Sequence, residues 1–152
     1  MAMLAAAAVL APAIPMPSGP VKDQTVATWT ISDEEEGERL EYSLTVHSGM
    51  LEVREIEFCS TCPPKGGVST TRVKLADVRR FSRDTIEGEE GVVPVHRIGI
   101  TTRGEHDVTW TDSSGHTRTG AGTPGFAAFE IDQKRLRDEV YRKLCAMIGQ
   151  TP

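Results

Sequence analysis

Cys59 and Cys62, three positions apart, are the residues whose type and spacing point most directly to chemistry. Two thiols at this spacing suit a small disulfide ring, half of a zinc site or a thiol redox pair. A redox pair of the thioredoxin type precedes a helix whose N-terminus lowers the thiol pKa, but Pro63 and Pro64 follow here and disfavour a helix. We therefore interpret the pair as a structural disulfide or two unpaired thiols, with a thiol redox or metal-binding protein as the alternative.

A zinc site built on these two thiols would need two more ligands, because structural zinc is four-coordinate. The other candidate ligands do not form a second pair at short spacing, so we predict no metal site and no cofactor. We expect the third cysteine to be a small buried thiol at the border of the apolar face of a C-terminal helix. These other candidates are Cys145, His47, His96, His106 and His116.

Five carboxylates lie close together between the first two predicted strands. We interpret them as a solvated acidic turn. Calcium binding needs converging oxygens at the spacing D-x-D-x-D-G, which this run lacks, as do Glu87, Glu89 and Glu90 further along the chain. An acidic loop also repels the phosphates of an inositol lipid. The residues of the loop are Asp33, Glu34, Glu35, Glu36 and Glu38.

Two further patterns match catalytic motifs by letter alone. Residues 120–125 satisfy G-x-G-x-x-G, but they lead into a predicted strand, so no helix N-terminus would receive a pyrophosphate, and we interpret them as a loop. Asp112, Ser114 and His116 supply the residue types of a hydrolase triad, but a triad converges from separate elements. We interpret residues 112–115 as a hairpin turn. We therefore predict no catalytic residues and a protein that is not an enzyme.

Most of the chain is expected to form β-strands, because apolar residues recur at every second position. The alternation is most regular from Leu40 to Val46, and Ser48-Gly49 then predicts a tight hairpin to a second strand. In that strand the alternation slips by one residue, and a β-bulge near Arg54-Glu55 would keep Ile56 and Phe58 facing inward with the rest. Shorter alternating segments bring the total to about seven strands; they lie at residues 27–31, 73–75, 78–81, 93–100, 108–110 and 129–131.

A C-terminal helix is predicted over residues 133–148. Asp132 is placed to cap its N-terminus, and Ile131 can pack on Leu136 across the cap as a hydrophobic staple. Apolar residues spaced three or four apart form one face of the helix, and Gly149 provides the stop. The apolar face consists of Leu136, Val140, Leu144, Met147 and Ile148, and charged residues that include Arg137 occupy the rest.

Length and composition indicate one globular domain, at residues 21–152, after a segment of different character. The chain has 152 residues and a net charge of −5, which disfavours nucleic-acid binding. Residues 1–20 are rich in Ala and Pro and form a signal-peptide-like or disordered segment, with cleavage expected between residues 12 and 20 if the chain is exported. We expect an extracytoplasmic protein, periplasmic or secreted, with a cytoplasmic one as the alternative. No apolar stretch approaches the ~20 residues of a transmembrane anchor, and we predict none.

The order of about seven antiparallel strands and one C-terminal helix resembles the pleckstrin-homology-like superfold. Arg72 to Phe81 resembles its fourth strand and the following turn, and Phe129 to Asp132 resembles its last strand and the start of its helix, so that the resemblance covers about residues 24–149. It implies a mostly β (α+β) fold, a bent sheet or partly open barrel closed by the helix. Members of the superfold bind phosphoinositides or peptides or have structural roles, and the acidic loop argues against phosphoinositides. We therefore predict a non-enzymatic module that binds a protein or peptide partner.

We predict that Cys59 and Cys62 are joined if the chain reaches an oxidising compartment, since a Pro/Gly-rich turn brings both sulfurs within bonding distance at little cost. Because the closed loop is short, the bond should add only ~1–2 kcal/mol to the free energy of unfolding. Thiol labelling of the unreduced protein, followed by mass analysis, should give at most one label, on Cys145. Three labels would contradict the disulfide, and stoichiometric zinc released by a chelator would favour the metal-binding alternative.

Overall fold

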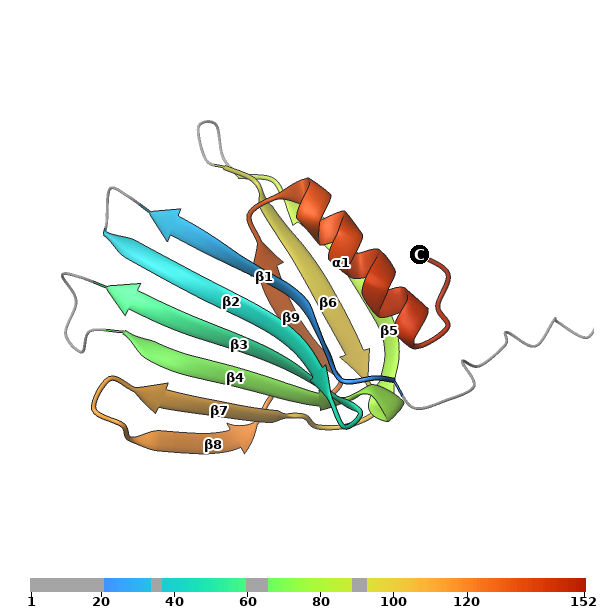
Figure 1. Cartoon of the computed structure of the whole chain (residues 1–152), viewed down its shortest axis with the longest axis horizontal. Helices are drawn as coiled ribbons and strands as arrows, with labels where there is room; N and C mark the ends of the chain where they lie inside the picture. The colour runs from blue at the N-terminus through green and yellow to red at the C-terminus, as the bar shows by residue number, and fades with distance from the viewer. Residues whose placement is uncertain (1–20, 34–36, 60–65, 89–92) are drawn as a thin grey trace, which may run out of the picture.

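Nine strands and one α-helix make up the described part of the chain in the computed structural model (Figure 1). The structure describes residues 21–33, 37–59, 66–88 and 93–152. Predictions that fall outside these residues stay predictions; they concern residues 1–20, Glu34, Glu35, Glu36, Cys62, Glu89 and Glu90. The strands are β1 (Gln24–Asp33), β2 (Glu38–His47), β3 (Met50–Cys59), β4 (Gly67–Lys74), β5 (Val78–Ile86), β6 (Val95–Thr102), β7 (Asp107–Asp112), β8 (Thr117–Ala121) and β9 (Phe126–Ile131), with a 3-10 turn η1 (Leu75–Asp77) before β5 and the helix α1 (Lys134–Met147) at the end.

The strands form two antiparallel sheets. The six-stranded sheet has the order β1-β2-β3-β4-β7-β8, and the three-stranded sheet has the order β5-β6-β9. The prediction of a mostly β fold ended by one helix is confirmed, and the sheets do not close into a barrel. The strand that the sequence reasoning missed is β8. All five of its residues are exposed, so it carries no apolar alternation, and Gly120 and Ala121 belong to it and not to a loop.

The hairpin between β2 and β3 turns at Ser48-Gly49, as predicted. Both residues have positive φ, +50° and +76°, which the two-residue turn of a twisted antiparallel hairpin requires. The Ser48 N–H donates to the carboxylate of Asp23 at 2.7 Å, and the carbonyl oxygen of Gly49 accepts from the N–H of Leu75 at 2.9 Å. The turn is therefore tied to the residue just before β1 and to the first residue of η1, just after β4.

β2 and β3 pair without a bulge, which corrects the prediction of one near Arg54-Glu55. Their register is continuous over all ten residue pairs. Ile56 and Phe58 therefore lie on the outer face of the sheet, and Glu55 takes an inner-face position. Phe58 is 40% exposed, and the Arg39 guanidinium lies 4.4 Å from the centre of its ring. The unbroken register is favoured because the Arg39 guanidinium covers part of the exposed Phe58 ring, whereas a bulge would leave one residue of β3 without a hydrogen-bonded partner on β2.

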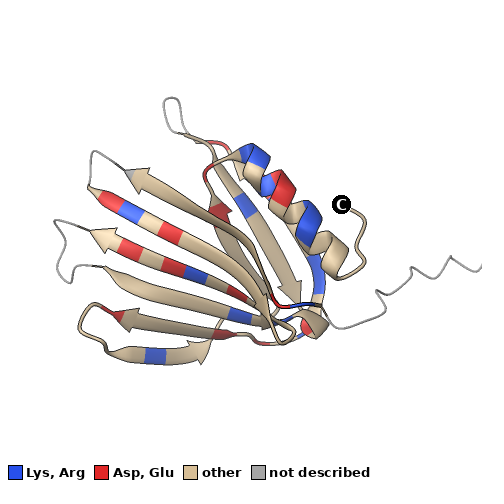
Figure 2. Cartoon of the chain, in the orientation of Figure 1, with Lys and Arg blue, Asp and Glu red and all other residues tan. Residues whose placement is uncertain are grey.

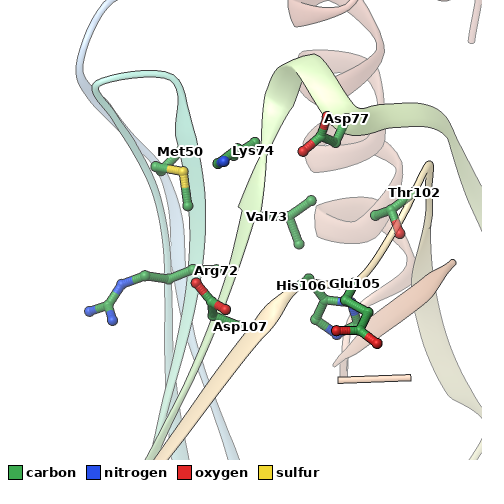
Figure 3. Close-up of a pocket in the computed structure, with 9 residues that line it drawn as sticks. All are labelled: Met50, Arg72, Val73, Lys74, Asp77, Thr102, Glu105, His106 and Asp107. Carbon is green, nitrogen blue, oxygen red and sulfur yellow. The ribbon is translucent and has the colours of Figure 1, made fainter. Parts of the chain in front are cut away.

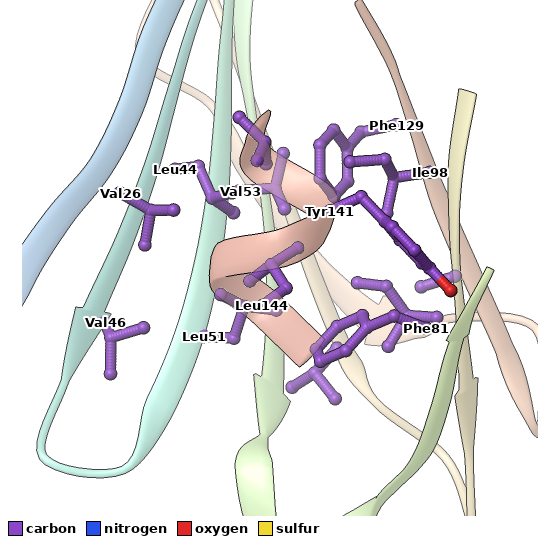
Figure 4. Packing of buried hydrophobic residues seen from close by; sticks show 14 of the residues in the cluster. Val26, Leu44, Val46, Leu51, Val53, Phe81, Ile98, Phe129, Tyr141 and Leu144 are labelled. Carbon is purple, nitrogen blue, oxygen red and sulfur yellow. The ribbon is translucent and has the colours of Figure 1, made fainter. Parts of the chain in front are cut away.

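The core lies between the inner faces of the two sheets and the apolar face of α1 (Figure 4). Leu44 and Leu51 come from the six-stranded sheet, Phe81 and Ile98 from the three-stranded sheet, and Leu144 from the helix. All five are 0% exposed, and full burial of such a side chain contributes about 1.5–3 kcal/mol. The predicted apolar face of the helix is confirmed: Val140 and Leu144 are fully buried, and Leu136, Met147 and Ile148 pack against the core.

The two ends of α1 differ in how well the sequence predicts them. The helix begins after Gln133, and no side chain makes a capping hydrogen bond, so Asp132 is not the cap that we predicted. The helix stops at Gly149 as predicted, with a φ of +69°. The Gly149 N–H donates to the carbonyl oxygen of Ala146 at 3.4 Å, and the next N–H donates to that of Cys145 at 2.9 Å, which is the Schellman arrangement.

Arg137 is buried, although the sequence places it among the charged residues of the helix. It is 5% exposed. Its guanidinium donates to the carbonyl oxygen of Asp84 at 2.7 Å and to Oγ1 of Thr85 at 2.8 Å, and it pairs with Asp138 at 2.7 Å. Because these partners satisfy the buried donors, Arg137 ties α1 to β5 instead of facing solvent.

Substitution Leu144→Asp is expected to unfold the protein. Loss of a fully buried Leu costs about 2–5 kcal/mol, and an unpaired buried carboxylate costs more, against a usual total stability of about 5–15 kcal/mol. Arg135→Asp puts the same carboxylate on the exposed side of α1 and should leave the melting temperature nearly unchanged. Thermal unfolding followed by circular dichroism checks both variants, and an unaltered transition in Leu144→Asp would contradict this placement of the helix.

Candidate functional site

A single row of opposed residues crosses the inner face of the six-stranded sheet. Directly opposed residues of antiparallel strands lie on the same face, with Cβ atoms about 4.5–5.5 Å apart, so the row brings side chains from all six strands together. It combines aromatic, acidic, hydroxyl and basic groups. From β1 to β8 the row consists of Trp29, Tyr42, Glu55, Ser69, Trp110 and Arg118.

Trp29 fixes the β1 end of this row. Its ring stacks on Tyr42, with the ring centres 5.0 Å apart and the planes 5° from parallel. Its indole Nε1 donates to the carbonyl oxygen of Glu130 at 2.9 Å, and its ring centre lies 5.7 Å from that of Phe129. The buried indole N–H therefore has an acceptor, and β9 is held against the inner face of the six-stranded sheet.

Tyr42 and Glu55 form a polar pair next to the stacked rings. Tyr42 is 6% exposed, and its hydroxyl hydrogen-bonds the Glu55 carboxylate. Burial, and then the hydrogen bond and negative charge of Glu55, raise the pKa of the Tyr42 phenol far above its ordinary value. The phenol thus remains a donor, and the carboxylate keeps lone pairs for further donors.

A cavity of about 410 Å³ opens beside this pair, between the six-stranded sheet and β9. The Glu55 carboxylate lies on the face of the sheet that lines it, Glu130 of β9 belongs to its rim, and no Lys or Arg is found among the described residues of its lining. Figure 2 shows acidic and basic residues on β2 and β3 and an acidic residue on β9. We call this cavity, together with the free edge of β9 and Trp110, the inner groove. The rest of its lining includes Leu40, Val53 and Phe129 as apolar residues and Ser69 and Thr71 as hydroxyl groups.

β9 presents an unpaired edge to the inner groove. It ends the three-stranded sheet and pairs with β6 on one side. The carbonyl of Glu130 points away from β6, because it accepts from Trp29, and residues two apart in an antiparallel ladder point the same way. The N–H and C=O of Ala128 and the N–H of Glu130 therefore face away from β6 and have no neighbouring strand.

The opposite edge of the three-stranded sheet is covered by the C-terminal segment. On β5, the Phe81 N–H donates to Oε1 of Gln150 at 2.8 Å, and Nε2 of Gln150 donates to the Phe81 carbonyl at 2.9 Å. The carboxamide thus takes the place of a neighbouring strand. The backbone N–H and C=O of Phe81 are thus hydrogen-bonded by a side chain, whereas those of Ala128 on β9 are open to an added strand.

The two sheets differ in width, so part of the inner face has no second layer. Six strands face three, and β4, β7 and β8 form the side of the larger sheet that is remote from α1 (Figure 1). Trp110 lies on this part and is 37% exposed. Its ring packs near Gly67, where a Cβ atom would lie 3.3 Å from the ring, so the absence of a side chain lets the indole approach β4.

A second, smaller pocket lies beside the β2–β3 hairpin (Figure 3). It measures about 120 Å³ and mixes basic residues, Arg72 and Lys74, with carboxylates such as Asp107. His106 lines it and is 7% exposed, and its Nδ1 has no hydrogen-bond partner among the described residues. The ring fills the space next to Gly122, where an added Cβ would collide with it. Because Nδ1 is shielded and the charges have both signs, this pocket selects no ligand chemistry, and the inner groove is the better candidate.

Cys59, Cys145 and Glu38 are not among the described residues that line the inner groove. Cys59 is buried at the end of β3, and Cys62 lies outside the described residues, so their disulfide remains a prediction. Cys145 is a free and buried thiol, as expected. Asp33 and Glu38 lie opposite each other where β1 ends and β2 begins. In the part of the chain that the structure describes, no three His, Cys, Asp or Glu side chains converge to hold a metal.

Asp112, Ser114 and His116 form the hairpin turn that the sequence predicts. Oδ1 of Asp112 accepts from the N–H groups of Ser114 at 2.9 Å and His116 at 3.0 Å, which builds the turn between β7 and β8. The Ser114 hydroxyl donates to the same carboxylate. This hydrogen bond is the main reason that the pKa of Asp112 lies below its usual range. The imidazole of His116 is 84% exposed, so no pocket encloses these groups. His47 and His96 lie on other strands, β2 and β6.

Sequence reasoning missed most of the inner groove. The slip in alternation assigned Glu55 to a bulge, whereas an alternation continued straight from Leu51 would have placed it on the inner face. Trp110 is predicted in a strand, but nothing in its neighbourhood signals that its face is uncovered. Ser69 and Arg118 lie in segments without apolar alternation, and the free edge of β9 depends on which strands become neighbours.

No protein-family model, curated protein or solved structure matches the chain. Among the described residues, no helix is both long enough and apolar enough to cross a membrane.

The native protein is expected to resist tyrosine ionisation at pH 10, where a free phenol is about half ionised. Burial raises the pKa of Tyr42 and that of Tyr141. Because the folded-state pKa exceeds the unfolded one, the free energy of unfolding should fall as pH rises above about 10 and unfolding releases protons. Tyr42→Phe should weaken this fall. Absorbance at the tyrosinate band and denaturant unfolding at several pH values measure both effects, and half-ionisation of a tyrosine near pH 10 in the folded protein would contradict the Tyr42 environment.

Proposed function

We propose that this protein is a non-enzymatic interaction module that binds a protein or peptide partner in the inner groove. The observation that carries the proposal is the open edge of β9 beside a cavity of about 410 Å³. Peptide-binding modules use a free strand edge for main-chain hydrogen bonds and adjacent pockets for side chains. Trp110 adds an exposed aromatic surface of the kind that is enriched at interfaces.

We propose that the chain follows the strand plan of the pleckstrin-homology-like superfold, which its sequence resembles. β1 to β4 are consecutive neighbours in one sheet, β5, β6 and β9 form the other, and α1 follows. On this plan the β7–β8 hairpin is an insertion before the last strand, and it widens the first sheet. Because one fold carries many functions, the proposal depends on the inner groove and not on the resemblance.

The groups in the inner groove favour binding over catalysis. Tyr42 and Glu55 are bonded to each other, and the raised pKa of Tyr42 keeps the phenol neutral near pH 7, where it is a poor base or nucleophile. Ser69 stands between Glu55 and Trp110 in the row, without a His beside it to activate its hydroxyl. Neutral donors, a carboxylate and apolar walls are what a binding site for an extended segment needs.

A substitution that fills the inner groove should abolish binding. Ser69→Trp places a large ring in the cavity, whereas Thr45→Trp places the same ring on the outer face of β2. Peptides selected from a random library on the immobilised full-length protein should lose about tenfold or more of their affinity for Ser69→Trp and bind Thr45→Trp like the wild type. Fluorescence polarisation measures the affinities.

Circular dichroism and thermal melting establish that both variants are folded. Equal affinity of the selected peptides for the two folded variants would place the binding site elsewhere. A library that yields no specific peptide would contradict the proposed function.

A further inference from the structure

We propose that the partner contributes an extended segment that pairs with the free edge of β9 as a fourth strand and places a Lys or Arg side chain beside Glu55. This inference rests on the proposed function and specifies the chemistry of the partner. Three features of the inner groove support it: the open backbone groups of β9, the uncovered part of the six-stranded sheet and the negative charge of the cavity.

The open edge of β9 offers a defined set of hydrogen-bonding groups. They are the N–H and C=O of Ala128 and the N–H of Glu130. The Trp29 indole already occupies the Glu130 carbonyl, so the pairing of an incoming strand would end there. Ala128 is small and exposed, and among the described residues no side chain hydrogen-bonds its N–H or C=O in the way that Gln150 covers Phe81 on β5. An extended segment can therefore approach this edge without displacing any part of the described chain.

An added strand would also supply the layer that the six-stranded sheet lacks. Neighbouring strands lie about 4.8 Å apart and packed sheets about 10 Å apart, so a strand beside β9 would extend the three-stranded sheet over β4 and β7. It would cover Val108 and Trp110, which are partly exposed on that face. Burial of this apolar surface would favour association without any change in the core.

The charge of the cavity determines which side chain this strand presents. Glu55 lines the cavity, and Glu57 follows it on the same face of β3, so that two carboxylates share the inner face there. The Tyr42 hydroxyl uses part of the Glu55 carboxylate, which can accept further hydrogen bonds from an ammonium or guanidinium group. Trp110 lies two strands from Glu55, across Ser69, where its ring can pack against the methylene stem of such a side chain. An acidic side chain there would meet like charges.

Two matched peptides test the basic side chain. They are heptapeptides of Thr and Val, which favour extended backbone, with either Lys or Glu at the central position. We expect the full-length protein to bind the Lys peptide about tenfold or more tightly than the Glu peptide in fluorescence polarisation. Glu55→Lys should reverse this preference and Glu55→Gln should remove most of it. Glu41→Lys, which changes a carboxylate on the outer face of β2, should keep it.

Hydrogen exchange and a proline substitution test the strand addition. Bound peptide should slow the amide exchange of Ala128 and Glu130, whose N–H groups face away from β6 in the free protein. Ala128→Pro removes an N–H that faces away from β6, so it leaves the β6–β9 ladder intact while it abolishes peptide binding.

Each contrary result overturns a different statement. Equal affinity for the Lys and Glu peptides, or a Glu preference in the wild type, overturns the basic side chain. Unchanged exchange at Ala128 with peptide bound, or binding retained by Ala128→Pro, overturns strand addition, and the proposed function still stands if Ser69→Trp abolishes the binding of library peptides. If neither heptapeptide binds, this inference fails, and the library selection decides separately on the proposed function.

Discussion

The unequal width of the two packed sheets is the constraint on which the rest of this structure depends. Three strands cannot cover six, so the core is closed over part of the larger sheet and open over the remainder. Leu44 and Leu51 lie under the second layer and are fully buried, whereas Val108 and Trp110 on the same face stay partly exposed. The hydrophobic effect that builds the core thus leaves an apolar strip of the sheet without a partner.

Trp29 determines where the three-stranded sheet stops covering the six-stranded sheet. Its stack on Tyr42 and its hydrogen bond to the Glu130 carbonyl hold β9 across the larger sheet at one position. The hydrogen-bonded pair of Tyr42 and Glu55 lies at this boundary. The Glu55 carboxylate lines the cavity there and accepts a hydrogen bond from the buried Tyr42 phenol. The same contact that completes the core therefore also shapes the inner groove.

The two edges of the three-stranded sheet differ in whether their outward-facing backbone groups are hydrogen-bonded. At β5 the Gln150 carboxamide donates to and accepts from Phe81, so that edge is closed by the chain itself. At β9 the Glu130 carbonyl accepts from Trp29 and the Phe126 N–H donates to the carbonyl oxygen of Thr123, whereas the groups of Ala128 are left for another strand. The pocket at His106 offers no such open backbone edge: the buried Nδ1 has no partner among the described residues, and charges of both signs line the pocket, so it selects no single ligand.

Local signals in the sequence by themselves determined much of the secondary structure. The alternation from Leu40 to Val46, the turn at Ser48-Gly49 and the stop at Gly149 each depend on residues a few positions apart, and all three are confirmed. They also predicted the mostly β fold with one C-terminal helix, since period and turn chemistry act within an element.

Only the tertiary structure decided which residues share the inner groove. It kept Glu55 on the inner face, because β3 pairs with β2 in unbroken register. It buried Arg137, because carbonyl and hydroxyl acceptors on β5 meet the helix there. It left β9 with a free edge beside a carboxylate, because Trp29 binds Glu130, 101 positions further along the chain. Contacts between residues so distant in the sequence arise from the packing of whole sheets, so they cannot be predicted from the periodicity of one segment.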